Sequence, residues 1–456
     1  MFVVKKTVFM ILKLSVMNPI WKRSLLLLMF LFFSLTGLFA ADGTAIDSGA
    51  TAWMLTSTAL VLLMIPGLAM FYGGLVRSKN VLGTIMHSYI AMGIISVLWV
   101  IVGYSMCFGG NVLGGWFGWN PDYFFLKGID TNVMDAGIPE YVFSMFQGKF
   151  AIITPALIAG AFAERVSFKA YCFFIALWSL LVYNPLCHWV WGADGFLFKL
   201  GAKGAIDFAG GTVVHISAGI SGLVAALYLR ARRGYPYQVI RPNNMVITML
   251  GAGLLWVGWF GFNAGSAAAA ATNATSAFVA TQIATGMAAV TWAVISWAHT
   301  GRPSTVGAAS GAVAGLVAIT PASGFVSPMS AIVIGIVASI VCYAAVMFKN
   351  RRKWDDALDT WGVHGIGGLA GALLTGLLAE QRFTPWGHNG LVFGNPFALV
   401  QNAVGAFAAL AWAVGITALI IKIMDKVWPG GIRVTPKEEE IGLDLAQHGE
   451  RAYVNE

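Results

Sequence analysis

Charged residues are scarce in this sequence. Only 11% of its 456 residues are charged, whereas soluble domains usually carry about 25%. The hydrophobic share is 58%, which is more apolar surface than a water-soluble core can bury. The net charge of +8 does not form one basic face, because lysine and arginine fall in short clusters between apolar runs. This pattern argues against a nucleic-acid partner and predicts a protein solvated by the lipid bilayer.

Cysteine is also rare, and its positions lack the spacing of a metal site or a disulfide framework. The four residues, all within apolar stretches and without a CxxC pair, are Cys107, Cys172, Cys187 and Cys342. No HExxH sequence occurs either. We therefore expect no bound metal, no other cofactor and no structural disulfide network.

The first 40 residues are typical of a secretory signal. A basic pair at 22–23 precedes an apolar run over 25–39, and small residues follow at 40–41. This order predicts a signal peptide at 1–40, with Met17 as an alternative start. The run is short for a membrane span, although an uncleaved anchor is the alternative. Cleavage would leave the mature N-terminus outside, which favours a bacterial inner membrane.

About eleven apolar segments are long enough to cross a bilayer of about 30 Å. They lie at 51–74, 81–107, 141–163, 170–191, 208–229, 243–263, 275–298, 304–322, 327–348, 361–380 and 396–424. The sequence therefore predicts an all-α integral membrane protein with about eleven transmembrane helices. Its membrane domain is expected at 41–430.

Positive residues are unevenly shared between the two sides of this predicted topology. One side holds Arg77, Lys79, Arg165, Lys169, Arg230, Arg232, Arg233, Arg241, Arg302, Lys349, Arg351, Arg352 and Lys353. The other side holds chiefly Lys127, Lys199, Lys203 and Arg382. Because cytoplasmic connections carry the excess of positive charge, this predicts a multi-pass inner-membrane protein with its N-terminus outside and its C-terminus in the cytoplasm.

Two segments repeat the same frame of residues. Asp207 stands eight residues before His215, and Asp356 stands eight residues before His364. Small residues follow each histidine at positions +3, +4 and +7, which share one face of a helix. The two helices are the fifth and the tenth, so they run in opposite directions. This predicts two inverted five-helix repeats plus a C-terminal helix, with a site between the repeats.

The two histidines are the first candidates for function. An ionisable side chain within lipid is costly, so a matched pair favours a functional role. The alternative is that each satisfies a neighbouring carbonyl. Metal binding is disfavoured because no third ligand is evident. An intramembrane hydrolase using His215 or His364 with Asp207 lacks a nucleophile, so we expect that the protein is not an enzyme.

Several longer segments carry a family resemblance. They are FQGKFAIITPALIAGAFAER at 146–165, HWVWG at 188–192, DFAGGTVVHISAG at 207–219, GWFGFNAGSA at 258–267, DTWGVHGIGG at 359–368 and IGLDLAQHGERAY at 441–453. In their order and spacing the chain resembles the ammonium transporter (Amt/Mep/Rh) family, in its bacterial Amt type. The resemblance implies an ammonium transporter or channel that forms a homotrimer. The alternative is an ammonium sensor with the transporter fold and weak conduction.

The resemblance also implies roles for individual residues. His215 and His364 resemble the family's twin pore histidines, and Phe150 and Phe262 resemble its stacked gate. Phe146, Trp191 and Ser266 resemble the external ammonium site. Asp207 resembles the buried aspartate near that site. For Asp207, a structural helix cap is the alternative.

These roles agree with the physical chemistry of ammonium. Aromatic faces attract a cation by about 0.5 to 2 kcal/mol each, and Ser266 can accept a hydrogen bond from it. An unpaired ion in a low-dielectric passage nevertheless costs many kcal/mol. We therefore expect the nitrogen to cross as neutral ammonia after losing a proton that the histidines can hold or relay. Potassium, which has no proton to lose, would be excluded.

The last segment, 431–456, is predicted to be a cytoplasmic regulatory tail. It is polar, yet it retains Ile441, Leu443 and Leu445, which a wholly disordered tail would not need. We expect it to dock on the cytoplasmic helix ends, and to offer a landing place for a PII-class signal protein. The expected ion pairs join Glu438, Glu439, Glu440 and Asp444 to Arg230, Arg232, Arg233 and the basic run at 349–353. A passive tail is the alternative.

Overall fold

The computed structural model describes residues 45–201 and 203–453, so the predicted signal peptide at 1–40 lies outside the described residues. In the described part, ten helices are long and apolar enough to cross a membrane. An eleventh apolar helix, Thr305–Ile319, has 15 residues and is therefore about 23 Å long. Each predicted span corresponds to one of these helices, which confirms the all-α membrane architecture.

The helices follow one another with short interruptions. The α-helices are α3 (Ser48–Leu75), α4 (Val81–Leu98), α5 (Tyr104–Phe108), α6 (Glu140–Ile158), α7 (Phe168–Trp178), α8 (Asn184–Trp191), α9 (Ser217–Leu229), α10 (Met245–Gly265), α11 (Thr272–Thr300), α12 (Thr305–Ile319), α13 (Pro328–Arg351), α14 (Ile366–Leu378), α15 (Pro396–Val427) and α16 (Pro436–Ile441). The 3₁₀ turns are η1 (Ser78–Asn80), η3 (Pro121–Leu126) and η7 (Leu391–Phe393), and the π-helical turns are η2 (Trp99–Gly103), η4 (Ser179–Tyr183), η5 (Gly211–Ile216), η6 (Trp361–Gly365) and η8 (Asp444–His448). Strands β1 (Gly110–Val112) and β2 (Phe117–Trp119) pair antiparallel.

Polar caps define where several spans begin. The side chains of Asp47, Ser167, Asn244, Ser304 and Ser327 each accept a hydrogen bond from a backbone N–H in the first turn of the helix that follows. Such bonds satisfy amides that have no partner within the helix. The apolar runs therefore start as helices at defined positions, at the ends of the bundle.

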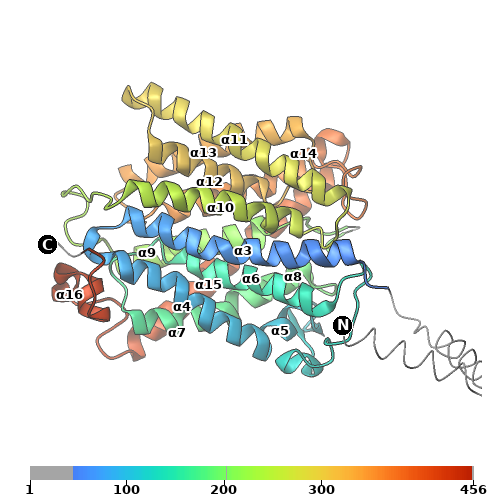
Figure 1. Cartoon of the computed structure of the whole chain (residues 1–456), viewed down its shortest axis with the longest axis horizontal. Coiled ribbons are helices and arrows are strands. Elements are labelled where there is room, and N and C mark those ends of the chain that lie inside the picture. Colours follow the sequence, from blue (N-terminus) through green and yellow to red (C-terminus); the bar gives the residue numbers. More distant parts are fainter. Residues whose placement is uncertain (1–44, 202, 454–456) are drawn as a thin grey trace, which may run out of the picture. The chain divides into compact units, whose positions relative to one another are not determined.

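The spans lie side by side as a bundle, with α3 packed along α10 (Figure 1). We call its two ends the Ser48 end and the Leu75 end, after the residues at which α3 begins and ends. Successive spans alternate in direction, so the connections 109–139, 192–210 and 379–395 lie at the Ser48 end. The connections 159–167, 230–244 and 352–360 lie at the Leu75 end, together with α16.

The two histidine helices cross each other antiparallel at the centre. The turn η5 contacts α14, and the turn η6 contacts α9, as two helices of opposite direction require. Their approach is close: a Cβ atom added at Gly219 would lie 2.0 Å from the backbone nitrogen of Gly365. Small residues permit this contact, as they do at other helix interfaces in membranes.

The segment after α15 folds back onto the Leu75 end. Its backbone pairs with the connection between α6 and α7, where the N–H of Val434 donates to the carbonyl of Arg165 (3.1 Å). Further on, Asn80 accepts from the N–H of Leu443 (2.8 Å), and Asp444 accepts from the N–H of Gly83 (2.8 Å). Hydrogen bonds between side chains and backbone N–H groups thus attach this segment to η1 and to the first turn of α4.

The side chains of this segment meet the bundle only partly as expected. Arg233 pairs with Glu440 (2.8 Å), whereas Asp444 accepts from the start of α4 instead of from a basic side chain. Glu438 instead completes the cap of α16 with Thr435. Of the three expected apolar contacts, Leu443 is buried but Ile441 and Leu445 are exposed. Most of these carboxylates therefore accept hydrogen bonds from backbone N–H groups and do not form the expected ion pairs. Such bonds cannot be predicted from the pattern of charged residues.

Candidate functional site

A cavity of about 640 Å³ opens at the Ser48 end, and we call it the Trp191 cavity. Its walls come from α5, α6, α8, the end of α10 and the connections at 192–210 and 379–395. The lining residues are Phe108, Phe143, Gln147, Val190, Trp191, Phe198, Lys199, Gly201, Lys203, Ala205, Ile206, Asp207, Phe208, Ser266 and Trp386. The structure therefore brings three predicted site residues, Trp191, Ser266 and Asp207, to one cavity.

The Trp191 indole and the Ser266 hydroxyl are each held by a backbone carbonyl. Nε1 of Trp191 donates to the carbonyl of Asp207 (2.9 Å), which leaves the faces of its ring free of polar contacts. The hydroxyl of Ser266 donates to the carbonyl of Phe262 (2.8 Å). Because its proton is engaged, its oxygen lone pairs remain available to accept a hydrogen bond. The site can thus offer a cation an aromatic face and an acceptor oxygen.

Asp207 caps the turn that carries His215. Its two oxygens accept four backbone N–H groups, those of Gly210 (2.8 Å), Gly211 (2.8 Å), Thr212 (2.7 Å) and Val213 (3.2 Å). Burial raises the pKa of Asp207 although these four amides favour its ionised form. Both oxygens are engaged, so the geometry matches the capping alternative.

Two tilted phenyl rings lie beyond Trp191, on the inner side of the cavity. The ring centroids of Phe150 and Phe262 lie 4.2 Å apart at 34°, and the Phe150 ring stands perpendicular to that of Trp191 at 5.8 Å. Phe146 lies 5.0 Å from Phe150 and is buried against Gly265, behind the cavity wall. Phe146 therefore supports the phenyl pair and does not line the cavity.

The two histidines meet directly beyond the phenyl pair. Nδ1 of His364 lies 3.3 Å from Nδ1 of His215, with the rings 5.3 Å apart at 22°. His215 also stacks on Trp259 (5.4 Å) and on Phe262 (6.1 Å). Nε2 of His215 is buried without a hydrogen-bond partner. One imidazole nitrogen is therefore free to bind a small polar molecule in the passage.

The space around the histidines is narrow and otherwise apolar. This histidine cavity has a volume of about 10 Å³, close to the minimum that holds one water molecule. Besides the two histidines it is lined by Met64, Leu68, Phe71, Ile153, Leu157, Val214, Leu255, Trp259, Phe262 and Val313. A hydrated cation does not fit in such a volume.

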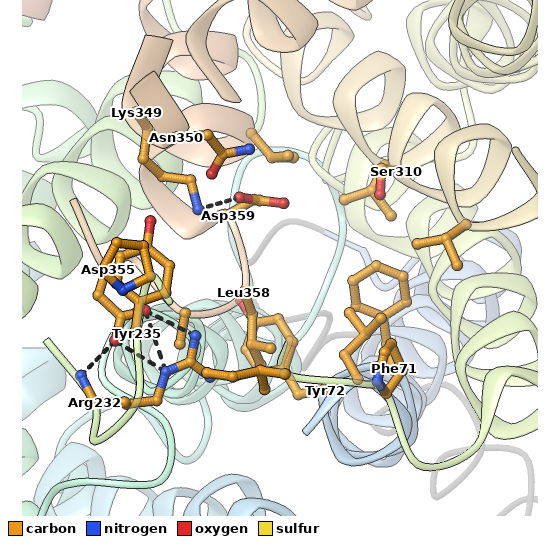
Figure 2. Close-up of a pocket in the computed structure, with 18 of the residues that line it drawn as sticks. Phe71, Tyr72, Arg232, Tyr235, Ser310, Lys349, Asn350, Asp355, Leu358 and Asp359 are labelled. Carbon is orange, nitrogen blue, oxygen red and sulfur yellow. Dashed lines mark hydrogen bonds and ion pairs between the residues drawn. The ribbon is translucent and has the colours of Figure 1, made fainter. Parts of the chain in front are cut away.

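A third cavity, of about 320 Å³, opens at the Leu75 end (Figure 2). We call it the Asp359 cavity. His364, Phe71 and Val313 line both this cavity and the histidine cavity. The three cavities therefore follow one another through the bundle, from Trp191 past the phenyl pair and the histidines to Asp359.

Two ion pairs line the Asp359 cavity, one buried and one partly exposed. Lys349 pairs with Asp359 (2.5 Å), and Arg232 pairs with Asp355 (2.7 Å), as Figure 2 shows. Burial opposes ionisation of Asp355, but the hydrogen bonds of Arg232 and the charge of Arg165 bring its pKa below the ordinary value. Charged groups thus surround the Asp359 cavity, while the lining of the histidine cavity is mainly apolar.

Comparison with known proteins decides the family. A model of the Ammonium Transporter Family matches residues 52–453. The chain belongs to this family. It is 46% identical over 416 residues to an ammonium transporter of Aquifex aeolicus, covering 91% of this chain and 95% of that protein. It is 44% identical over 412 residues to an ammonium transporter of Bacillus subtilis, covering 89% and 98%.

Solved structures of this ammonium transporter family are similar in fold as well. Saccharomyces cerevisiae Mep2 matches with a TM-score of 0.81 at 34% identity, over 87% of this chain and 91% of that one. A structure described as a sensor Amt protein matches with a TM-score of 0.79 at 29% identity, over 88% and 98%. The family resemblance of the sequence is thereby confirmed.

Some residues that line the cavities were not predicted from the sequence. Gln147 lies one helical turn after Phe143, and its Oε1 is buried without a hydrogen-bond partner beside the Trp191 cavity. The side-chain amide of Gln147, alone in an apolar span, could have indicated a residue that lines a cavity. Trp259 and Leu157 carried no such signal, because apolar residues line a pore and a core alike. Within the described residues, no group of three or more metal-ligating side chains is close enough to hold an ion.

Proposed function

We propose that this chain is an ammonium transporter or channel that recruits ammonium in the Trp191 cavity, lets its proton pass to the solvent of that cavity or to the paired histidines, and conducts ammonia past these histidines. One observation carries the proposal. A constriction of about 10 Å³, apolar apart from His215 and His364, lies between cavities of about 640 and 320 Å³. Family membership and relatives described as ammonium transporters support the choice of ammonium.

Ammonium has to lose its charge because the constriction would strip it of its hydration shell. Moving an ion from water into a low-dielectric passage costs several kcal/mol even after relaxation. The stacked faces of Phe150 and Phe262 can return only about 0.5 to 2 kcal/mol each. Neutral ammonia avoids most of this cost, and a deprotonated nitrogen is small enough to pass the phenyl pair when the rings move. Potassium cannot shed its charge and is excluded.

Recruitment precedes this step at the aromatic wall. The Trp191 face attracts the cation, and the oxygen of Ser266 accepts one of its hydrogen bonds. Phe146 supports the gate formed by Phe150 and Phe262 from behind. Asp207 acts as a positioning residue, because its four amide bonds fix the turn that presents His215.

The histidine pair handles the neutral molecule and its proton. With Nδ1 facing Nδ1 at 3.3 Å, one ring donates and the other accepts, so a proton can be held between them or passed on. The unpaired Nε2 of His215 offers ammonia a hydrogen-bonding partner inside the apolar passage. Each hydrogen bond to a histidine replaces one of the hydrogen bonds to water that ammonia loses on entering the constriction.

An ammonium sensor with weak conduction is the second candidate, favoured by the similarity to the sensor Amt protein. The two functions differ in flux and share the recruitment site. A sensor would bind ammonium in the Trp191 cavity but carry little of it across a membrane.

We further propose that the protein is a homotrimer in the inner membrane after removal of residues 1–40. The excess of lysine and arginine in the connections at the Leu75 end supports a cytoplasmic position for that end. The tail at 431–456 would then be cytoplasmic and regulatory. Glu439 of this tail accepts from the N–H of Arg233 (2.5 Å), next to a residue that lines the Asp359 cavity, which supports control of the exit by the tail or by a PII-class protein bound to it.

The test is ammonium flux into liposomes that contain the purified protein. We expect saturable uptake well above that of empty liposomes, and a higher half-saturating concentration in Trp191→Leu. Phe262→Ala should disturb the gate more than binding. Binding without flux would support the sensor, and absence of both binding and flux would contradict the proposal.

A further inference from the structure

We infer that Trp386 is a second aromatic contact for the cation, on the wall of the Trp191 cavity, and that Lys203 is the residue that positions it. The inference rests on the proposed function, because it assigns two further residues to the same cavity. It concerns capture of the cation before it reaches Trp191 and the phenyl pair.

The indole ring of Trp386 is held in place by its neighbours but is partly exposed to solvent. It lines the Trp191 cavity and remains 53% exposed. Its ring is parallel to that of Phe208 (6.1 Å, 4°) and stands on the edge of Phe325 (5.0 Å, 83°). Phe208 and Phe325 are both buried. Part of the indole is therefore anchored in the protein, while the rest is presented to the solvent of the cavity.

Lys203 fastens the turn that carries this tryptophan. Its Nζ donates to the carbonyl of Pro385 (3.1 Å) and to that of Gly387 (3.0 Å). These two residues flank Trp386 in the sequence. A lysine of the 192–210 connection thus holds the 379–395 connection at the backbone, on both sides of the ring. Without these bonds the turn would have more conformations to lose when the ring binds a cation.

The charges of the cavity explain why an aromatic contact is needed. Its ionisable lining residues are Lys199, Lys203 and Asp207. Lys199 is paired with Asp194, and both oxygens of Asp207 are engaged by backbone amides. The lining therefore offers no free carboxylate, so attraction of a cation depends on ring faces and on the neutral acceptor oxygens of Ser266 and Gln147.

The Trp386 ring is open to such a cation. Among the described residues, lysine and arginine stack on other rings, as Arg382 does on Phe383 at 4.7 Å, and none lies over Trp386. The chain's own cations thus leave this ring face free. Two tryptophans then line one cavity, the exposed Trp386 and Trp191 beside Phe150.

The test measures ammonium uptake against ammonium concentration in liposomes containing the full chain. Trp386→Leu should raise the half-saturating concentration about two- to fivefold and leave the maximal flux unchanged. Trp386→Phe should retain most of the affinity. The matched control is Trp119→Leu, because Trp119 is 44% exposed at the same end but does not line the cavity.

Variants of Lys203 separate positioning from simple repulsion. If Lys203 positions Trp386, Lys203→Met raises the half-saturating concentration as Trp386→Leu does, and Lys203→Arg restores it. If Lys203 only repels cations, Lys203→Met lowers that concentration, which would overturn its assigned role. Normal wild-type flux with an unchanged half-saturating concentration in Trp386→Leu would overturn the inference alone. Absence of wild-type flux would overturn the proposed function and the inference together.

Discussion

The decisive chemistry lies with a few residues that are far apart in the sequence. His215 and His364 are 149 positions apart, yet their Nδ1 atoms lie 3.3 Å from each other. Each belongs to a π-helical turn that follows a buried aspartate. Such turns occur frequently at functional sites, because they rotate side chains out of the regular helical register. An aspartate followed by a π-helical turn with a histidine thus occurs twice. The two aspartates lie at opposite ends of the membrane domain.

The first prediction concerns the histidines themselves. His215→Ala or His364→Ala should leave the protein folded but change ammonium flux at least tenfold, or admit potassium, because the passage loses its polar partners. His299→Ala is the matched control, since His299 is exposed and bonds to Tyr343. Flux and potassium exclusion are measured in liposomes. Wild-type values for both properties in both pore variants would contradict the proton-handling role.

A second prediction concerns Asp356, which accepts the N–H groups of Thr360 (3.1 Å) and Trp361 (2.8 Å). Burial raises its pKa from 3.8 to about 6, against the opposing charge of Lys349. A carboxyl with a raised pKa in the folded state stabilises the fold below its unfolded pKa, and this contribution is lost as the pH rises through about 6. Acidification from pH 7 to pH 5 should therefore add about 1 kcal/mol to the free energy of unfolding from this group.

Thermal unfolding in detergent measures this contribution. Asp356→Asn cannot ionise, so its stability should vary less with pH over this range than that of the wild type. Asp122→Asn, at an exposed carboxyl, should keep the wild-type dependence. Equal pH dependence in Asp356→Asn and in the wild type would show that this carboxyl does not titrate there.

At the scale of elements, the contact between the two histidine helices sets the geometry of the pore. Gly219 lies against the backbone of Gly365, where an added Cβ would lie 2.0 Å from nitrogen and 2.4 Å from Cα. Gly368 lies against His215 in the same way, with the two Cβ positions 2.9 Å apart. Neither helix can carry larger residues on this face without separating from the other.

The third prediction follows from this contact. Gly219→Ala should destabilise the protein by about 1 to 3 kcal/mol and reduce flux, since backbone must move to admit the methyl group. Gly253→Ala in α10 is the matched control, because its added Cβ would meet open space. The melting temperature and the flux of both variants are compared. A stable Gly219→Ala protein with normal flux would show that the helices do not need this close approach.

The tail is the second element with a testable role. Its bonds to Asn80, Gly83 and Arg165 tie it to the first turns of α4 and to the connection after α6. The contact with Arg233 extends it to the connection that lines the Asp359 cavity. It is therefore in a position to transmit the binding of a partner to the end of the pore.

The fourth prediction is that truncation after Gly431 lowers or deregulates transport and abolishes binding of a PII-class protein, without dissociating the proposed trimer. Asp444→Ala should give a milder form of the same defect, because α4 loses a carboxylate at its first turn, worth about 0.5 to 2 kcal/mol. Lys437→Gln, at an exposed side chain, serves as control. Unchanged flux together with unchanged PII affinity in the truncated protein would refute a regulatory tail.

At the scale of the whole molecule, the sequence predicted the spans and the inverted pair of histidine helices. Apolar length sets the spans, and the repeated Asp–His frame marks the pair, so both are visible without a structure. The cavities were not predictable in the same way. Phe143 and Gln147 lie on the face of α6 that lines the cavity, whereas Phe146 lies on an adjacent face. Which of these faces lines the cavity depends on how α6 packs against its neighbours.

The tail shows the same limit. Its charges suggested ion pairs with the helix ends predicted to be cytoplasmic, and of these the pair of Arg233 with Glu440 forms. Asp444 instead caps a distant helix, and Ile441 and Leu445 stay exposed. Any residue except proline can donate such a capping bond from its backbone N–H, so the donating partner carries no signature in the sequence and is found only in the folded chain.

The central claim is that the molecule passes nitrogen without its charge through a constriction that no hydrated cation can enter. The most direct measurement compares ammonium and potassium uptake by the wild-type protein in the same preparation of liposomes. The account predicts saturable ammonium uptake, and potassium uptake no greater than in empty liposomes, because potassium cannot lose a proton. Potassium uptake at a rate comparable with that of ammonium would contradict it.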